Sequence, residues 1–211
     1  MKFLSQIALA IMLLSVSFFY GQNVANEPQK KVFSAKLFGK SVFQGEKAWG
    51  NIAGVMTSFS PTINWGKEYG NYNEVELTDF GYEKTRISAN FRVGAQYSYN
   101  WKVYSKSEAS RFSYFIGSGV YGRFNSGYLD GSVDYYDTFS NFSAGISFIP
   151  RVNMKIGERL YLDLNVPLSI YEHQFTNGDS RYNGKNYSTN SNWGEFLPNK
   201  FTVNVGIAIK F

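Results

Sequence analysis

The sequence predicts an all-β protein, a single antiparallel up-and-down transmembrane β-barrel of eight strands that follows an N-terminal signal peptide. Three observations lead to this prediction. Apolar and polar residues alternate with a period of two along most of the chain. Several of these segments are longer than the roughly 9 to 11 residues that a tilted strand needs to cross a bilayer. The 211 residues include 20 glycines and no cysteine, which excludes a disulfide scaffold and a thiolate metal site.

The first residues have the pattern of an export signal. A basic start, Met1-Lys2, precedes an apolar stretch at 7–16 that is too short to span a membrane comfortably. We therefore expect a signal peptide at 1–21, a flexible polar lead-in at 22–31 and the barrel at 32–211.

Three segments alternate most clearly, at 86–102, 160–171 and 201–211. In the last of these, every second residue from Phe201 to Phe211 is apolar, as expected for a strand with one apolar face. Weaker alternation predicts five more strands, at 32–42, 54–65, 74–82, 112–124 and 138–154. Pro61 interrupts the second of these, so the strand count is open by two.

The predicted connections differ in length. Three fairly short ones, at 66–71, 102–111 and 155–159, are interpreted as periplasmic turns, and three longer polar ones, at 43–51, 125–137 and 172–199, as surface loops. The short connection at 82–86 does not fit this alternation. Loop 172–199 lacks apolar periodicity, so we expect it to be mobile and outside the membrane, with Tyr182, Tyr187 and Trp193 available for recognition.

A soluble lipocalin also has eight strands with a period of two, but its apolar face points inward. Here the apolar face is uninterrupted along the strongest strands and ends in aromatic residues, which suit lipid headgroups. Those near the expected periplasmic boundary are Trp65, Tyr97, Tyr99, Trp101, Phe112, Tyr114 and Phe211. The apolar final strand and the cysteine-free, signal-bearing chain also favour the membrane barrel.

The segment KIGERLYLDLNVPLSIY, the polar stretch after it and the ending LPNKFTVNVGIAIKF resemble the small outer-membrane β-barrel proteins of Gram-negative bacteria, the OmpA/OmpX-type barrel class. The match covers residues 86–211, and the Tyr-Gly-Gln at 20–22 is similar to signal endings in the Bacteroidetes group. The resemblance implies location in the cell outer membrane. It also implies that Phe211, with Ile209 and Ile207, forms a C-terminal signal read by the outer-membrane assembly machinery.

Charged residues at the polar positions predict a network inside the barrel, because charges removed from bulk water need partners. The predicted lumen network consists of Arg86, Arg92, Arg123, Arg151, Asp163, Lys210, Glu74 and Glu76. An eight-stranded barrel is just wide enough for such side chains, which favours a filled plug over a narrow passage that disfavours cations.

Three other patterns could carry chemistry, and each has a simpler explanation. Residues 117–122 read G-x-G-x-x-G, but no helix follows, so we expect the glycines to make room in the lumen. His173, Asp179 and Ser180 hold the residue types of a nucleophilic triad without fixed geometry. An acidic loop could bind Ca²⁺, although its spacing is not that of an EF-hand; its oxygen donors are Asn125, Asp130, Asp134 and Asp137.

The preferred functional hypothesis is a non-enzymatic outer-membrane barrel that serves as a structural or surface-interaction protein of the cell envelope. The alternative is a narrow passive channel or a lipid-handling barrel, and an outer-membrane hydrolase or acyltransferase ranks third. We expect no catalytic residue, cofactor or metal site. The expected partners are the lipid bilayer, the assembly machinery and a surface partner at loop 172–199. The net charge of +5 is dispersed, so no nucleic-acid partner is expected.

Overall fold

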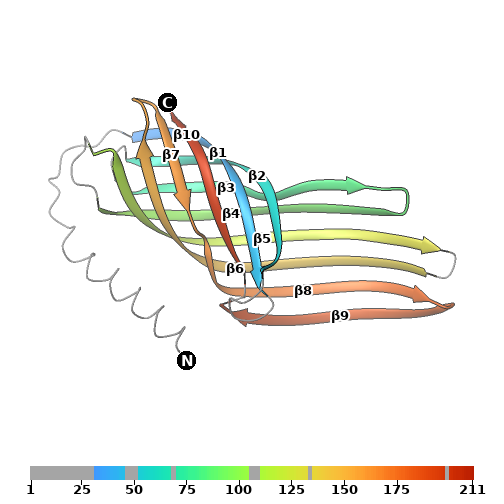
Figure 1. Ribbon diagram of the computed structural model, residues 1–211. Helices are drawn as coiled ribbons and strands as arrows, with labels where there is room; N and C mark the ends of the chain where they lie inside the picture. The colour runs from blue at the N-terminus through green and yellow to red at the C-terminus, as the bar shows by residue number, and fades with distance from the viewer. Residues whose placement is uncertain (1–30, 46–51, 68–69, 105–109, 133–134, 198–199) are drawn as a thin grey trace.

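A computed structural model describes residues 31–45, 52–67, 70–104, 110–132, 135–197 and 200–211. The predicted signal peptide and all but the last residue of the predicted lead-in lie outside the described residues. The described chain forms one antiparallel sheet of ten strands (Figure 1). The strands are β1 (Lys31–Gly45), β2 (Ile52–Lys67), β3 (Tyr72–Lys84), β4 (Ser88–Tyr104), β5 (Phe112–Ser132), β6 (Tyr135–Lys155), β7 (Leu160–Asn165), β8 (Leu168–Tyr182), β9 (Lys185–Phe196) and β10 (Lys200–Lys210).

The sheet closes into a barrel because β1 pairs with both β2 and β10. β7 and β8 act as one barrel strand interrupted at Val166–Pro167, and both pair with β6. β9 pairs with β8 beyond the closed part. The predicted barrel of eight strands is therefore confirmed, with β9 as an additional strand.

The register around the barrel gives its shear. Starting from Phe33 on β1, consecutive partners are Trp65, Asn73, Tyr99, Ser118, Phe148, Leu168 and Phe201, and the last of these pairs with Phe43. The path returns to β1 displaced by 43 − 33 = 10 residues. Strands in such barrels tilt by about 35 to 45° from the barrel axis.

Alternate residues of each strand point to opposite sides of the wall, and the apolar set points outward. These outward side chains are between 41 and 75% exposed and include Phe33, Leu37, Phe59, Ile63, Trp65, Val75, Tyr97, Val120, Ile146, Leu164, Val205 and Ile207. The inward side chains are buried and mostly polar, among them Thr62, Gln96, Ser98, Asn100, Ser147, Asn165 and Asn204, together with a few apolar ones such as Phe38, Phe115 and Ile149. This inside-out distribution contradicts the lipocalin alternative and makes the outer surface an apolar belt that suits lipid.

Aromatic residues border the belt at both ends. On the side of the chain termini, Tyr99 contacts Trp101 with ring centroids 4.8 Å apart, and Tyr104 lies 6.2 Å from Tyr114. On the opposite side, Phe142 lies 6.3 Å from Phe175. In outer-membrane barrels the end with short turns is periplasmic, which assigns the end of the barrel that carries Lys31 and Phe211 to the periplasmic side. None of the described residues belongs to a helix long and apolar enough to cross a membrane.

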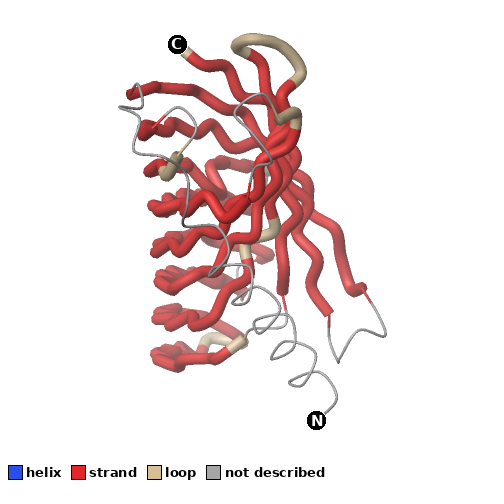
Figure 2. Tube along the Cα trace, turned by 90° about the vertical axis from the view of Figure 1, so that its left-hand side faces the viewer, coloured by secondary structure: helices blue, strands red, loops and turns tan. Residues whose placement is uncertain are grey.

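The strands extend far beyond the belt on the extracellular side. β5 and β6 each have 21 residues, about twice the roughly 9 to 11 that a membrane crossing needs. Beyond Phe124 and Phe142 the outward positions of these strands become polar, beginning with the paired Ser126 and Ser140. The extensions of β3, β4, β5, β6, β8 and β9 form a sheet that projects from the barrel (Figures 1 and 2), which we call the blade.

The blade corrects the prediction of long surface loops. Segment 172–199 is largely the hairpin of β8 and β9, and segment 125–137 is mostly paired strand at the tip of β5 and β6. Asn183 and Gly184 form the β8–β9 turn with φ of 49° and 72°, as the Asn-Gly preference of two-residue hairpins requires. β8 is held in place by backbone hydrogen bonds to β6. The hairpin therefore forms without an apolar alternation in its sequence. The connection at 82–86 is short because β3 and β4 continue as paired strands into the blade and are joined only at their tips.

The barrel wall is incompletely paired between β2 and β3. β2 and β3 share only five residue pairs, which end at Thr62 and Glu76. Beyond that point β2 pairs only with β1, and β3 only with β4. Pro61 occupies the first position past the shared ladder, where a missing backbone N–H removes no bond to β3.

Close packing in the lumen explains two of the glycines. A Cβ on Gly117 would lie 2.6 Å from Asn100 Oδ1 and 3.1 Å from Ile149 Cβ, and one on Gly119 would lie 2.8 Å from the Tyr97 carbonyl oxygen. Residues 117–122 lie within β5 and no helix follows them, and Gly117 and Gly119 make room in the lumen, as the sequence predicts.

We expect Gly117→Ala to lower the free energy of unfolding by about 1 to 3 kcal/mol, the usual cost of overpacking. Gly39→Ala is the matched control, because its Cβ would meet nothing nearer than 3.7 Å. Urea unfolding of both variants in lipid vesicles measures the difference. Equal stabilities would show that the lumen at β5 is not closely packed.

Candidate functional site

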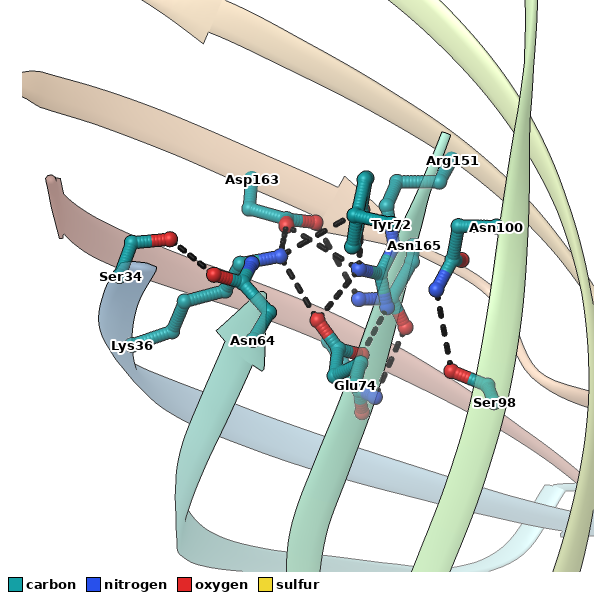
Figure 3. A network of polar contacts seen from close by, with 11 residues as sticks. Ser34, Lys36, Asn64, Tyr72, Glu74, Ser98, Asn100, Arg151, Asp163 and Asn165 are labelled. Carbon is teal, nitrogen blue, oxygen red and sulfur yellow. Dashed lines mark hydrogen bonds and ion pairs between the residues drawn. The ribbon is translucent and has the colours of Figure 1, made fainter. Parts of the chain in front are cut away.

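Four charged side chains meet in the middle of the lumen (Figure 3). Lys36 comes from β1, Glu74 from β3, Arg151 from β6 and Asp163 from β7, and each is at most 5% exposed. β6 and β7 are neighbours, whereas β1 and β3 lie elsewhere in the wall, so the side chains reach each other across the interior. We call these four residues the lumen cluster.

The charges of the lumen cluster alternate. Lys36 Nζ lies 2.7 Å from Glu74 Oε2 and 2.6 Å from Asp163 Oδ2. Arg151 donates to both oxygens of Glu74, with Nη2–Oε1 and Nη1–Oε2 distances of 2.5 and 2.6 Å, and its Nη1 lies 3.5 Å from Asp163 Oδ2. Two cations and two anions make the cluster formally neutral, which buried charges require.

Aromatic rings surround the two cations. The Tyr72 hydroxyl accepts hydrogen bonds from Arg151 Nη1 at 2.5 Å and from Lys36 Nζ at 3.5 Å. Lys36 Nζ also lies 4.8 Å from the Tyr72 ring centroid, and the Arg151 guanidinium lies 5.8 Å from that of Phe38, which is fully buried. Contacts of this kind stabilise cations that are removed from water.

Buried amides extend the network along the wall. Asn204 on β10 donates to Asn165 Oδ1 at 2.9 Å, and Asn165 donates to Asp163 Oδ1 at 3.3 Å. On the other side, Asn100 donates to Ser98 Oγ at 3.1 Å. The chain from Asn204 through Asn165 fixes the orientation of the Asp163 carboxylate relative to both cations.

A second buried group lies on the extracellular side of the cluster. Tyr121 on β5 donates to Glu172 Oε2 at 2.7 Å, and its oxygen lies 2.6 Å from Ser169 Oγ. Gln174 donates to Glu172 Oε1 at 2.6 Å, and Arg123 Nη1 lies 3.7 Å from the same carboxylate. The lumen therefore holds two successive layers of interacting side chains.

The structure distributes the eight predicted network residues over several places. Glu74, Arg151 and Asp163 belong to the lumen cluster, Glu76 is buried beside it on β3, and Arg123 belongs to the second layer. The remaining three lie towards the barrel ends: Arg92 pairs with Glu83 at 3.0 Å, Lys210 Nζ lies 4.4 Å from the Tyr161 ring centroid, and Arg86 is exposed. Arg86 does not face the lumen, because β3 ends at Lys84 and residues 85–87 form the turn to β4.

The predicted network omits Lys36, Tyr72, Tyr121 and Glu172. Lys36 occupies a polar position in the weakly alternating first strand, and a lone lysine between apolar neighbours is a usable signal of an inward charge. Glu172 falls at the start of the segment that the sequence analysis assigns to a loop. The omissions of Lys36 and Glu172 therefore follow from a weak strand assignment and from a missing one, respectively.

The other candidate motifs do not assemble. His173 and Asp179 point outward on β8 while Ser180 points inward, so the three cannot form a triad. His173 instead interacts with Asn192 through Nε2 and with the Tyr171 hydroxyl through Nδ1, at 2.9 Å for the latter. Among the acidic-loop residues, the Asp134 prediction lies outside the described residues. No group of three or more potential His, Cys, Asp or Glu metal ligands occurs in the described part of the chain.

Phe211, Ile209 and Ile207 are 73, 48 and 54% exposed on the outer side of the wall. The Phe211 N–H donates to the Phe33 carbonyl oxygen at 2.9 Å, which joins the end of the chain to β1. Their role as an assembly signal stays a prediction.

Neither a family model nor a curated protein sequence matches this chain. Several solved structures are similar to it. The outer membrane protein AlkL, determined in DMPC lipid bilayers, superposes with a TM-score of 0.55 and 14% identity over 89% of this chain and 93% of AlkL. Weaker similarity is found to Ail, the attachment invasion locus protein of Yersinia pestis (TM-score 0.48, 8% identity, 88% of this chain and 100% of Ail). Neisserial surface protein A has a TM-score of 0.39 with 16% identity over 88% of this chain and 100% of that protein. The fold is that of an outer-membrane β-barrel.

Proposed function

We propose that this protein is a non-enzymatic outer-membrane barrel whose sealed lumen forms a rigid anchor and whose blade contacts a partner at the cell surface. The lumen cluster supports the anchor role, because its ion pairs link β1, β3, β6 and β7 across the interior. Filling of this kind suits a barrel of eight strands, whose interior is just wide enough for side chains.

The observation that carries the proposal is the asymmetry of the β8–β9 hairpin. The register places Tyr182, Tyr187 and Trp193 on the same face, and they are 56, 51 and 44% exposed. Towards the tip, the opposite face carries Ser188 and Asn190, paired with Asp179 and Asn177, and its exposed aromatic residues Phe175 and Phe196 lie nearer the barrel. Exposed aromatic rings on a rigid strand provide large contact area at low entropic cost, which suits recognition.

Site-specific photo-crosslinking on intact cells tests this proposal. A photoreactive phenylalanine analogue replaces Tyr187 or Trp193 in one pair of variants, and Ser188 or Asn190 in the matched control pair on the opposite face. We expect a discrete cross-linked adduct from the aromatic face and none from the control face. Absence of adducts from both faces, or equal adducts from both, would contradict recognition by the aromatic face.

Shortening the hairpin tests the separation of anchor from recognition. Joining Thr176 to Ser191 by an Asn-Gly turn removes the tip of β8 and β9 but keeps their pairing near the barrel. The shortened protein keeps Trp193 and should still migrate faster on gels before boiling than after it, while the adduct from a photoreactive residue at position 193 disappears because Tyr182 and Tyr187 are gone. Loss of this heat-dependent shift would show that the hairpin is needed for folding.

The early end of the β2–β3 ladder favours a second candidate, a lipid-handling barrel. Past Thr62 and Glu76 the two strands no longer pair with each other, although their ladder ends within the apolar belt. Cysteines at Ser60 and Thr78, the first buried positions beyond the ladder, joined by a bifunctional maleimide would tie the strands together. Lipid transfer between vesicles that stops on cross-linking would favour this candidate, and unchanged transfer would exclude it.

A further inference from the structure

The aromatic face of the β8–β9 hairpin carries a symmetric series of residues. On β9 the series consists of every second residue, which places all its members on the face of Tyr187 and Trp193. The members are Lys185, Tyr187, Thr189, Ser191, Trp193 and Glu195. Lys185 and Glu195 are equally far from Asn190, the midpoint of the series, and so are Tyr187 and Trp193. Each half of the series therefore contains a charge, an aromatic ring and a hydroxyl, and the two charges are opposite.

The charges and rings of this series are accessible. Lys185 is exposed, Glu195 is partly exposed, and Tyr187 and Trp193 are about half exposed. Within the described part of the chain, neither Lys185 nor Glu195 lies in an ion pair. Both charges are therefore available to a partner.

The series lies on a regular strand outside the closed barrel. β9 ends at Phe196, and the wall continues in β10, which begins at Lys200 and pairs with β1. β9 is the last strand in the order of the sheet, and its pairing with β8 has no register shift (Figure 1). The hairpin therefore presents the series in a fixed order on the extracellular side of the β1–β10 wall.

The order of the series makes the aromatic face complementary to itself. A second copy can be turned by 180° about an axis beside Asn190 that is perpendicular to the strand and parallel to the sheet. Lys185 of each copy then lies opposite Glu195 of the other copy, and Tyr187 lies opposite Trp193. Each contact contains every such pair twice, as in any twofold interface.

The dimensions of packed sheets allow these contacts. Two sheets that pack face to face lie about 10 Å apart, and their side chains interdigitate. The long side chains of a lysine and a glutamate together span this distance, and the aromatic rings fill the space beside them. Two hairpins bury less area than a standard interface, so a single contact is weak. Many copies on two opposing surfaces would strengthen it through avidity.

The direction of the hairpins determines where the second copy stands. In the twofold contact, the tip of one hairpin, at Lys185, lies beside the base of the other, at Glu195. Two copies in one membrane direct their tips the same way, which would place each lysine beside the other lysine. The complementary arrangement therefore needs two opposing membranes.

We propose that the aromatic face binds the same face of a second copy of this protein in an opposing membrane, so that the blade mediates contact between cells. This inference rests on the proposed function, in which the blade is a recognition surface, and it identifies the partner.

Mixed aggregation of intact cells tests the proposal. Two strains that differ only in a cytoplasmic fluorescent protein display the full barrel, and flow cytometry counts the two-coloured aggregates. The variants are Lys185→Glu and Glu195→Lys. The matched control is Lys84→Glu, which makes the same charge reversal at the exposed end of β3, on the other edge of the blade. Heat-dependent gel migration verifies that each variant is folded.

We expect Lys185→Glu in both strains to give about tenfold fewer two-coloured aggregates, because the two charge pairs of each contact become repulsive. Glu195→Lys in both strains should cause the same loss, and Lys84→Glu should cause none. Lys185→Glu cells mixed with Glu195→Lys cells should aggregate again, because opposite charges then face each other. The proposal would be overturned if wild-type cells did not aggregate, if the mixture did not recover, or if Lys84→Glu caused an equal loss.

The identity of the photo-crosslinked adduct separates this proposal from the proposed function. A photoreactive residue at Tyr187 should give an adduct with twice the mass of this chain that contains no other protein. An adduct with a different protein would overturn the contact between two copies and leave surface recognition by the aromatic face intact.

Discussion

Glu74→Ala is expected to lower the free energy of unfolding by about 3 to 5 kcal/mol, because removal of one partner leaves buried charge uncompensated. Lys36 and Arg151 would then share the single carboxylate of Asp163 inside the barrel. Neither cation has bulk water to replace the lost partner, since their side chains are at most 2% exposed. The change therefore removes one anion from a balanced set of four charges.

A second glutamate–arginine pair provides the control. Glu83 lies 3.0 Å from Arg92 on the blade, and its side chain is 70% exposed. Exposed pairs contribute about 0 to 1 kcal/mol, so Glu83→Ala should change stability little. Urea unfolding in vesicles measures both variants, and a loss for Glu74→Ala no larger than for Glu83→Ala would contradict the closed, dry lumen.

Val120→Arg is expected to destabilise the inserted barrel by about 2 to 4 kcal/mol, the cost of a cation on the lipid-facing side near the midplane. Val120 is 56% exposed on the outer wall, between its cross-strand partners Tyr97 and Ile146. It lies between the aromatic borders marked on the same strand by Tyr114 and Phe124. The guanidinium of an arginine at this position would lie far from both headgroup layers, so it would remain in the hydrocarbon region.

Ser126→Arg is the matched control, since Ser126 has the same outward orientation on β5 but lies beyond Phe124. We expect it to leave vesicle insertion and stability nearly unchanged. If the two arginines had equal effects, the apolar belt would not end at Phe124 and the limits of the membrane assigned here would be wrong.

The strand pattern and its facing could be predicted from the sequence because a barrel wall separates lipid from a polar interior. That contrast appears directly as alternation, and it correctly places Gln96, Ser98 and Asn100 inside the lumen. The blade gives no such contrast, because both of its faces meet water. The sequence of the polar hairpin that turns at Asn183–Gly184 therefore predicts a loop, although only the turn is irregular.

The composition of the lumen cluster depends on register, which alternation does not contain. Lys36 and Asp163 are 127 residues apart and meet only because the barrel closes with the shear described above. Glu74 and Arg151 meet across the interior for the same reason. The sequence could therefore predict inward charges, but it could not predict which of them form pairs, or that Arg86 falls in a turn.

The sealed lumen is the central claim, and conductance across a planar lipid bilayer tests it most directly. The wild-type barrel should insert without producing a steady current, because the ion pairs of the lumen cluster cross the interior and the Tyr121–Glu172 layer lies on its extracellular side. Insertion is verified independently by heat-dependent gel migration of protein recovered from the same vesicles. A stable, ohmic current that scales with the amount of inserted protein would contradict the sealed lumen and favour a channel.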